Sequence, residues 1–147
     1  MKANDPHRMT SVTPDDPQLL AGVRLANDFI AESPTYRHLA PLDIAKVIEF
    51  AYTCRANDNE FVNVAVCDGT VIGFFMGSIT SYGFDTATFA YDRMLYVTPD
   101  RRGGAAARML IDAFERWATD KGAIRILLGI TTGLHTDATE KFYNKLG

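Results

Sequence analysis

The segment FVNVAVCDGTVIGFFMGSIT, residues 61–80, restricts the fold more than any other part of the chain. It is rich in β-branched and aromatic residues, which favour strands. Two apolar runs flank Asp68 and Gly69, and an Asp-Gly pair in that setting is a strong signal for a tight hairpin turn. The segment therefore predicts two antiparallel strands, and the fold must contain an antiparallel sheet.

Further strands and helices are predicted on both sides of this hairpin, from apolar residues at helical spacing and from β-branched or apolar runs. The predicted elements are a short strand at 9–13, helices at 17–31 and 42–56, the hairpin at 61–80, a long strand at 88–97, a helix at 105–120, an apolar strand at 123–130 and a helix at 137–147. The run AIRILLGI at 123–130 is almost entirely apolar, as expected for a central strand with both faces covered. With no repeat and no internal linker, residues 1–147 are predicted to form one mixed α/β domain.

The composition limits the classes of function. The 147 residues are 47% apolar and 22% charged, which is typical of a globular domain. The formal charge of -3 argues against a dedicated nucleic-acid binder, which carries an excess of positive charge. No apolar run approaches the roughly 20 residues of a membrane span, and Cys54 and Cys67 lack the partners of a metal site. We therefore expect a cytoplasmic protein without metal, nucleic-acid or membrane partners.

The stretch RRGGAAARML, residues 101–110, places two glycines between the strand at 88–97 and the following helix. Unpaired amides converge at such a helix N-terminus and the helix dipole adds positive potential, so the loop can hold a phosphate or a pyrophosphate. A plain turn is the alternative. The spacing matches neither the P-loop pattern GxxxxGK[ST] nor the dinucleotide pattern GxGxxG, so neither kind of nucleotide site is predicted.

The same loop resembles the acyl-CoA loop of the GNAT N-acetyltransferase superfamily, whose pattern Q/R-x-x-G-x-G/A follows a strand that ends in V-x-P. VTP at 97–99 precedes the loop, and RRGGAA at 101–106 satisfies the pattern. A register one residue later matches the family's common Arg-Gly pair, but it puts Ala105 and Ala107 at two positions that are usually glycine. Methyl groups there could crowd a pyrophosphate, because glycine allows close approach of the backbone. Both registers remain open.

The chain also carries KFYNKLG at 141–147, which resembles the final-helix sequence FYEKLG of the family. Together the two matches imply a GNAT-like fold, with a central mixed, mostly antiparallel sheet, helices on both faces and the element order β-α-α-β-β-β-α-β-α. The family continues past FYEKLG with two more strands, whereas this sequence stops at Gly147. Either the sequence is cut short, or another subunit supplies the strands, as in a homodimer, or the acceptor site is incomplete.

The resemblance implies an N-acetyltransferase that moves an acetyl group from acetyl-CoA to a primary amine by direct attack, without a metal. The acceptor would be a small molecule or a peptide. One alternative is a catalytically inactive relative that serves as a structural or assembly subunit, and another is an unrelated nucleotide binder. The cofactor-binding residues that the resemblance implies are Leu95, Tyr96 and Val97 for the pantetheine arm and Arg101, Arg102, Gly103, Gly104, Ala105 and Ala106 for the pyrophosphate.

Tyr143 is the first candidate catalytic residue. By the resemblance, it matches the tyrosine that donates a proton or a hydrogen bond to the leaving thiolate. A thiol has a pKa of about 8.5, so a donor that meets the sulfur makes it a better leaving group. The alternative is that Tyr143 only packs the last helix on the sheet.

Asp92 is the second candidate, as the base that accepts a proton from the attacking amine through water. It lies in the middle of the strand at 88–97. On a period of two, it shares a face of that strand with Ala90, Met94 and Tyr96. The alternative is a half-buried carboxylate that forms an ion pair with a neighbouring arginine, such as Arg93 or Arg125.

Glu32 and Tyr36 are candidate acceptor-binding residues. They lie in ESPTYRH, residues 32–38, after the first predicted helix, where the GNAT family shapes its acceptor pocket. A solvated helix end is the alternative interpretation of this cluster. His7 and His135 have no partner at metal-ligand or catalytic-triad spacing, and we interpret them as surface residues.

Overall fold

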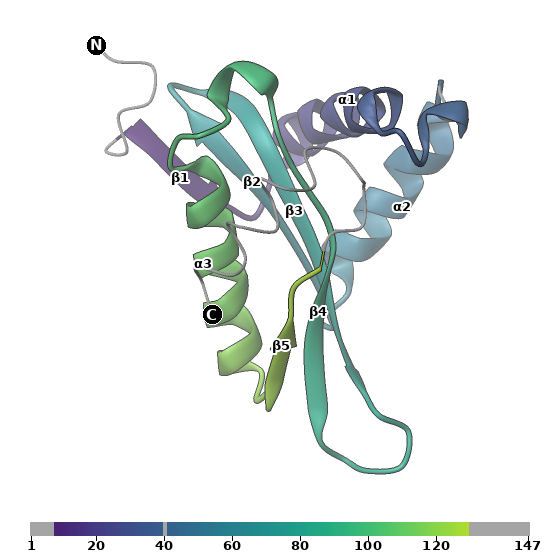
Figure 1. Cartoon of the computed structure of the whole chain (residues 1–147), viewed down its shortest axis with the longest axis vertical. Coiled ribbons are helices and arrows are strands. Elements are labelled where there is room, and N and C mark those ends of the chain that lie inside the picture. Colours follow the sequence, from purple (N-terminus) through teal and green to yellow (C-terminus); the bar gives the residue numbers. More distant parts are fainter. Residues whose placement is uncertain (1–7, 40, 130–147) are drawn as a thin grey trace.

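A computed structural model describes residues 8–39 and 41–129, which form a five-stranded sheet with helices on both faces (Figure 1). The elements follow in the order β1 (Met9–Val12), α1 (Asp16–Glu32), the 3-10 helix η2 (Arg37–Leu39), α2 (Ile44–Ala56), β2 (Glu60–Cys67), β3 (Thr70–Ser81), β4 (Thr88–Val97), the 3-10 helix η3 (Pro99–Arg101), α3 (Ala106–Asp120) and β5 (Arg125–Leu127). The predicted α/β class and the mixed, mostly antiparallel sheet are confirmed. The helix predicted at 137–147 lies outside the described residues.

The strands lie side by side in the order β1-β2-β3-β4-β5. The first four pair antiparallel, and β5 pairs parallel with β4. A parallel pair needs a crossover connection, which α3 provides. Between β2 and β3, Asp68 and Gly69 have φ angles of 50° and 81°, as a tight hairpin turn requires. The hairpin expected from the sequence is therefore present.

The core has two parts because α3 packs on one face of the sheet while α1 and α2 pack on the other (Figure 1). On the α3 face, the buried ring of Phe114 has its centroid 4.6 Å from that of Phe75. On the opposite face, Phe29 of α1 packs against Phe74 and Tyr96, at centroid distances of 6.2 and 5.7 Å. Tilted and edge-on aromatic contacts stabilise beyond the area they bury.

Side-chain caps set the first residues of α1 and α2. The Asp15 carboxylate accepts from the backbone N–H of Gln18 at 2.9 Å, and the Gln18 side chain accepts from the Asp15 N–H at 3.0 Å, which is a capping box. Asp43 caps α2 by accepting from the N–H of Lys46 at 3.3 Å. The apolar pattern placed the start of this helix two residues too early, because the cap makes Ile44 its first residue.

A β-bulge interrupts the pairing of β4 with β3. Met94 lies opposite Met76, but Asp92 lies opposite Gly77, so Arg93 is the extra residue of the bulge. A bulge of this kind breaks the strict alternation of side chains along a strand.

The bulge changes which residues of β4 lie on the same face of the sheet as Asp92. Ala90 belongs to the core under α3, whereas Tyr96 and Met94 pack in the core under α1 and α2. Asp92 lies opposite Gly77, where an added Cβ would meet a ring of α3 at 2.3 Å, so both positions face α3. Asp92 therefore shares a face with Ala90, as expected, but not with Met94 and Tyr96. The expectation failed because the period of two does not continue through Arg93.

β5 differs from the central strand that the apolar run at 123–130 predicted. It comprises Arg125–Leu127 and lies at the end of the strand order in the described part of the chain. Arg125 and Leu127 are exposed, while Ile126 packs on the core under α3. Pairing with β4 ends where Leu127 meets Tyr91. Within residues 123–129, the run therefore buries one face against α3, and the burial of both faces stays a prediction.

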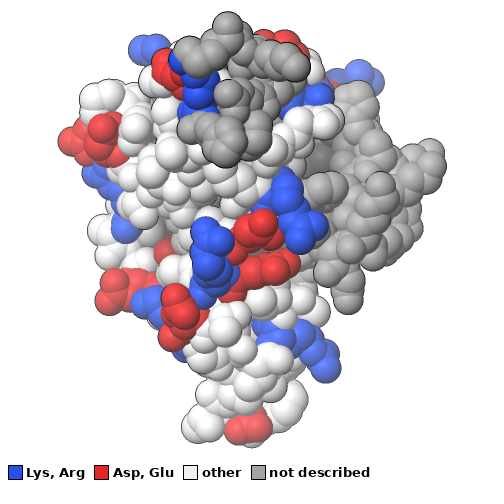
Figure 2. Space-filling model, turned by 90° about the vertical axis from the view of Figure 1, so that its left-hand side faces the viewer, with Lys and Arg blue, Asp and Glu red and all other residues white. Residues whose placement is uncertain are grey.

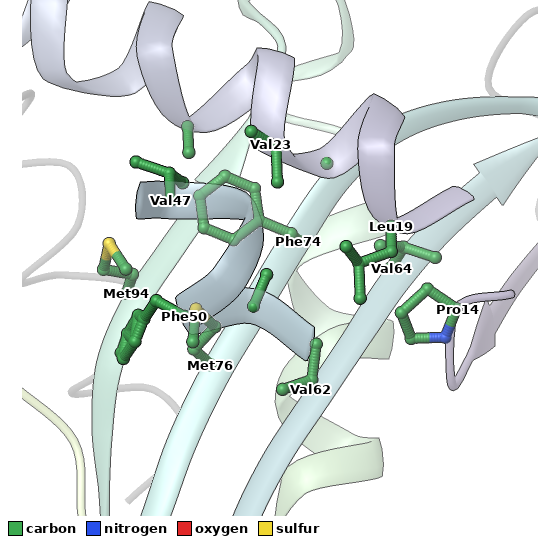
Figure 3. Close-up of a pocket in the computed structure, with 13 residues that line it drawn as sticks. Pro14, Leu19, Val23, Val47, Phe50, Val62, Val64, Phe74, Met76 and Met94 are labelled. Carbon is green, nitrogen blue, oxygen red and sulfur yellow. The ribbon is translucent and has the colours of Figure 1, made fainter. Parts of the chain in front are cut away.

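α2 packs loosely and leaves a cavity of about 60 Å³ between itself, α1 and the sheet (Figure 3). Cys54 is the one buried side chain of α2, whereas Ile44 and Phe50 are 41% and 38% exposed. The lining consists of Pro14, Leu19, Gly22, Val23, Ala26, Val47, Phe50, Ala51, Val62, Val64, Phe74, Met76 and Met94. Atoms that face such a void lose van der Waals contacts, so this side of the core has room to be filled.

Two glycines should respond in opposite ways to an added methyl group. At Gly22 in α1, a Cβ would meet Val64 at 3.6 Å, which is an ordinary contact beside the cavity. We expect Gly22→Ala to stabilise the fold by about 1 kcal/mol, because alanine also favours a helix. At Gly77, a Cβ would lie 2.3 Å from the buried ring of Phe114, so Gly77→Ala should destabilise by about 2 kcal/mol. Urea unfolding measures both, and shifts of the same sign would contradict the packing described.

Candidate functional site

The chain between β4 and α3 forms a loop with open backbone amides. After η3 (Pro99–Arg101), Gly103 adopts a φ of 84°, a conformation that favours glycine. α3 begins at Ala106, and the side chain of its N-cap, Ala105, makes no capping bond. In the part of the chain that the structure describes, the amides of residues 103–108 have no backbone or side-chain acceptor. A helix N-terminus with unpaired amides is a favourable place for an anion.

Arg102 is held at the base of this loop by two neighbours. Its Nη1 and Nη2 donate to the two carboxylate oxygens of Glu32 at 3.0 and 3.1 Å, which is a bidentate ion pair. Its Nε donates to the backbone carbonyl of Val97 at 2.9 Å. The two side chains are 26% and 31% exposed, so solvent screens this pair less than a pair on the open surface. The end of α1 is thereby joined to the end of β4.

Tyr96 completes what we call the α1–β4 cluster, consisting of Glu32, Tyr96 and Arg102. The Tyr96 hydroxyl donates to Glu32 Oε1 at 2.7 Å, and the Arg102 guanidinium lies over the Tyr96 ring, 5.2 Å from its centroid. Burial, together with the bond to the Glu32 carboxylate, raises the pKa of Tyr96 well above its ordinary value of 10. The phenol therefore stays protonated and keeps donating to Glu32.

Arg101 lies beside the loop with a different set of contacts. Its Nη1 is 3.7 Å from the Cys67 sulfur, and its Nε is 3.7 Å from the Asp100 carboxylate. On the exposed side of α3, Arg108 donates to Asp112 at 3.0 Å. Figure 2 shows acidic and basic side chains interspersed on the side of the molecule where β1 and α3 lie. Beside the loop, positive potential would therefore come from Arg101 and from the N-terminus of α3, because Glu32 offsets the charge of Arg102.

β4 and β5 separate beside Asp92. Their pairing ends at Tyr91, although β4 continues to Val97, and within residues 8–39 and 41–129 no strand pairs with the outer edge of β4 beyond that point. Asp92 is 8% exposed and accepts from the backbone N–H of Gly129 at 2.9 Å. This hydrogen bond joins β4 to the segment after β5 at the point where the pairing of the two strands ends.

The three residues expected to offer backbone groups to pantetheine lie past this separation. Leu95 and Val97 pack on the core under α3, and Tyr96 points to the opposite face. All three pair with β3 along one edge of β4. The carbonyl of Val97 is the acceptor for Arg102. These backbone positions lie next to the loop at 101–106, and their contact with pantetheine stays a prediction.

Of the two residues expected to bind the acceptor, Glu32 lies in the α1–β4 cluster and not in a separate pocket. Tyr36 is half-buried in the loop after α1, and its amide donates to the hydroxyl of the buried Ser33 at 3.3 Å. Tyr143 lies outside the described residues.

Glu60, Ser78 and Arg93 form a polar group that no sequence pattern indicated. Arg93 Nη1 donates to Glu60 Oε1 at 3.2 Å, and the Ser78 hydroxyl donates to the other oxygen of Glu60. The Arg93 guanidinium also lies over the ring of Phe50 in α2, 5.3 Å from its centroid. The three residues come from three strands, and the bulge directs Arg93 to the α2 face. Only the tertiary structure brings them together.

Within residues 8–39 and 41–129, no group of three or more His, Cys, Asp or Glu side chains is arranged to hold a metal ion. None of the helices in that part of the chain is long and apolar enough to cross a membrane.

We expect Tyr96→Phe to cost about 1 kcal/mol of stability, because Glu32 loses one hydrogen-bond donor. The pKa of Tyr96 is raised in the folded state, so the unfolded chain releases the phenolic proton first as pH rises through 10. The stabilisation by Tyr96 is therefore complete below pH 10 and is lost above it. The difference in unfolding free energy between wild type and variant should shrink between about pH 7 and about pH 11. Urea unfolding at both values measures it, and a difference that grows with pH would refute this account.

Comparisons with known proteins agree with this geometry. The profile of the acetyltransferase (GNAT) family matches residues 20–147, while no curated protein matches the sequence. The solved aminoglycoside N-acetyltransferase AAC(6')-Iy, in complex with the bisubstrate analog CoA-S-monomethyl-acetylneamine, has a TM-score of 0.76 and 22% identity over 95% of this chain and 89% of that chain. A transcriptional regulator from Bacillus halodurans C-125 has a TM-score of 0.77 and 17% identity, covering 95% and 91% of the two chains.

An aminoglycoside acetyltransferase from an uncultured soil metagenomic sample, meta-AAC0020 in complex with sisomicin, is a further similar structure. Its TM-score is 0.74 and its identity 15%, covering 95% of this chain and 87% of that chain. At these identities the structural likeness establishes the fold. The profile match extends over the four strands β2 to β5 and over the open loop before α3. The chain belongs to the acetyltransferase (GNAT) family.

Proposed function

We propose that the protein is an acetyl-CoA-dependent N-acetyltransferase whose acceptor is a primary amine on a small molecule. The observation that carries the proposal is the run of amides at residues 103–108, which have no acceptor in the described part of the chain and of which Gly103 and Gly104 are exposed. The run lies between the end of β4, which no longer pairs with β5, and the N-terminus of α3 in a chain of the GNAT family. A diphosphate needs several N–H donors and positive potential, and both are available there. A similar solved structure that holds a CoA-containing bisubstrate analog supports the same donor.

The residues of the loop fit such a ligand. Gly103 and Gly104 are exposed, so their bare backbone is accessible. Ala106 is buried in the core under α3, and Ala105 and Ala107 pack against that core. The methyl groups of these alanines therefore have neighbours inside the protein, and alanine in place of glycine does not by itself block the approach of a diphosphate.

The proposed reaction forms a bond from the amine nitrogen to the thioester carbonyl carbon and breaks the carbon–sulfur bond. The amine loses a proton and the departing thiolate of CoA gains one. We assign Tyr143 as the donor to the sulfur and Asp92 as the group that accepts the amine proton through water. The position of Asp92, buried where β4 and β5 separate, supports its role, because the reacting thioester would lie beside that separation.

The choice of a small-molecule acceptor rests on two of the similar structures, which are described as aminoglycoside acetyltransferases. Tyr36, in the loop after α1, remains our candidate for contact with the acceptor. Glu32 is less suited to that contact, because each of its carboxylate oxygens already accepts from Arg102.

Calorimetric titration with CoA and, separately, with ATP tests the proposal. We expect binding of CoA without binding of ATP. Binding of neither would favour the inactive structural subunit, and binding of ATP alone would favour an unrelated nucleotide binder. A screen of small amines with detection of free CoA would then identify the acceptor, and turnover with peptides alone would contradict the small-molecule assignment.

Gly103→Ala should weaken CoA binding about tenfold, because alanine strains a backbone at positive φ by about 1 kcal/mol and shifts the amides of the loop. Gly83→Ala is a matched control. Gly83 has a φ of 86°, lies between β3 and β4, and has as much space for a Cβ as Gly103. Both variants should lose similar stability in thermal unfolding, and calorimetry should show weaker CoA binding for Gly103→Ala alone. Equal CoA affinities in the two variants would argue against the binding of CoA by the loop at 101–106.

Tyr143→Phe should lower kcat about 100-fold and leave the affinity for CoA nearly unchanged, because it removes the proton donor and keeps the ring. Steady-state kinetics with the amine found in the screen provides the measurement, with circular dichroism as the check of folding. If the folded variant has a normal kcat, Tyr143 has only a packing role.

A further inference from the structure

We propose that Glu32 is a positioning residue of the donor site, which holds Arg102 and thereby the loop that receives the diphosphate. The inference rests on the proposed function. It gives Glu32 a role in the binding of CoA, through Arg102, in place of contact with the acceptor amine.

The first support is the way in which Arg102 is anchored. Its guanidinium is held by Glu32 at one end of α1 and by the carbonyl of Val97 at the end of β4. Its backbone N–H makes a long bond, 3.4 Å, to the carbonyl of Pro99. A bond of that length restrains the chain weakly, so the side chain carries most of the restraint. The next residue is Gly103, the first of the open amides.

The second support is the chemistry of the pair. A guanidinium presents a planar fork of donors that a carboxylate matches with two oxygens, whereas a lysine or an amide does not match it. Tyr96 also donates to Glu32 Oε1 at 2.7 Å and stays protonated, so it orients the carboxylate for this contact. The glycines that follow Arg102 have no such restraint of their own, because glycine has the largest conformational freedom of any residue. Fixing Arg102 therefore limits the shapes that the loop can adopt.

The third support is the charge balance at the loop. An unpaired carboxylate near a bound diphosphate would repel it. Glu32 is paired with Arg102, so the contact neutralises its charge. The pair Arg55–Asp16 offers a comparison, because it has the same kinds of group but joins α2 to the first turn of α1, at the other end of that helix from Glu32. Asp16 is 65% exposed, and a pair at that place has little influence on the loop.

The experiment measures dissociation constants of wild type, Glu32→Gln and Asp16→Asn by calorimetry, with CoA and with pantetheine as the two ligands. Pantetheine lacks the diphosphate. Glu32→Gln keeps the size of the side chain and removes the bidentate partner, so we expect CoA to bind about tenfold more weakly and pantetheine to bind as before. Asp16→Asn, the matched control, removes the carboxylate partner of Arg55 and should leave both constants unchanged. A general disturbance of the fold would weaken both ligands alike.

A double-mutant cycle tests whether Glu32 acts through Arg102. Arg102→Gln should weaken the binding of CoA at least as much as Glu32→Gln, and the double variant should be no weaker than Arg102→Gln alone. Should Glu32→Gln fail to fold, Arg102→Lys keeps the charge and removes the fork, and it should show the same selective loss of CoA affinity.

Three results would overturn the inference while leaving the proposed function intact: unchanged or tighter CoA binding by Glu32→Gln, an equal loss for pantetheine, or additive losses in the cycle. Tighter binding would mean that Glu32 competes with the diphosphate for Arg102. A wild-type protein that binds no CoA would instead overturn the proposed function, and the role of Glu32 with it.

Discussion

The contact of Phe114 with β3 is the interaction on which the site depends. The ring lies against Phe75 and fills the space over Gly77, where even a methyl group would come within 2.3 Å of it. A close-packed contact of this kind leaves little freedom for the helix to shift. It holds α3 on the sheet, and the N-terminus of α3 then lies at the end of β4 with its amides open.

Two further contacts shape the surroundings of that helix N-terminus. Asp92 accepts a hydrogen bond from the amide of Gly129 at the point where the pairing of β4 with β5 ends. The bulge at Arg93 reverses the faces of the sheet on which the following side chains of β4 lie. The α1–β4 cluster joins α1, on one face of the sheet, to the loop that precedes α3, on the other face. The proposed donor site is thus held by elements from both layers, although residues 103–106 of its loop are only glycine and alanine.

Much of the fold could be predicted because its signals are local. The Asp68-Gly69 turn and the apolar spacing of the helices each depend on a few neighbouring residues, and the elements lie close to where these patterns placed them, although the cap at Asp43 starts α2 two residues later. The apolar run at 123–130 predicted a longer strand than β5, because composition does not reveal how far a strand stays paired. β5 ends after Leu127, where its pairing with β4 also ends.

The sequence by itself determined that a glycine loop follows a strand and opens a helix, because strand, turn and helix signals act over a few residues. It also supplied the family resemblance that the profile match confirms. Only the tertiary structure decided that Glu32 meets Arg102, 70 residues further along the chain, and that Asp92 faces α3. Both depend on how β4 bends and where α1 ends relative to it. No local pattern specifies such a distance between segments, because it is set by the packing of the whole core.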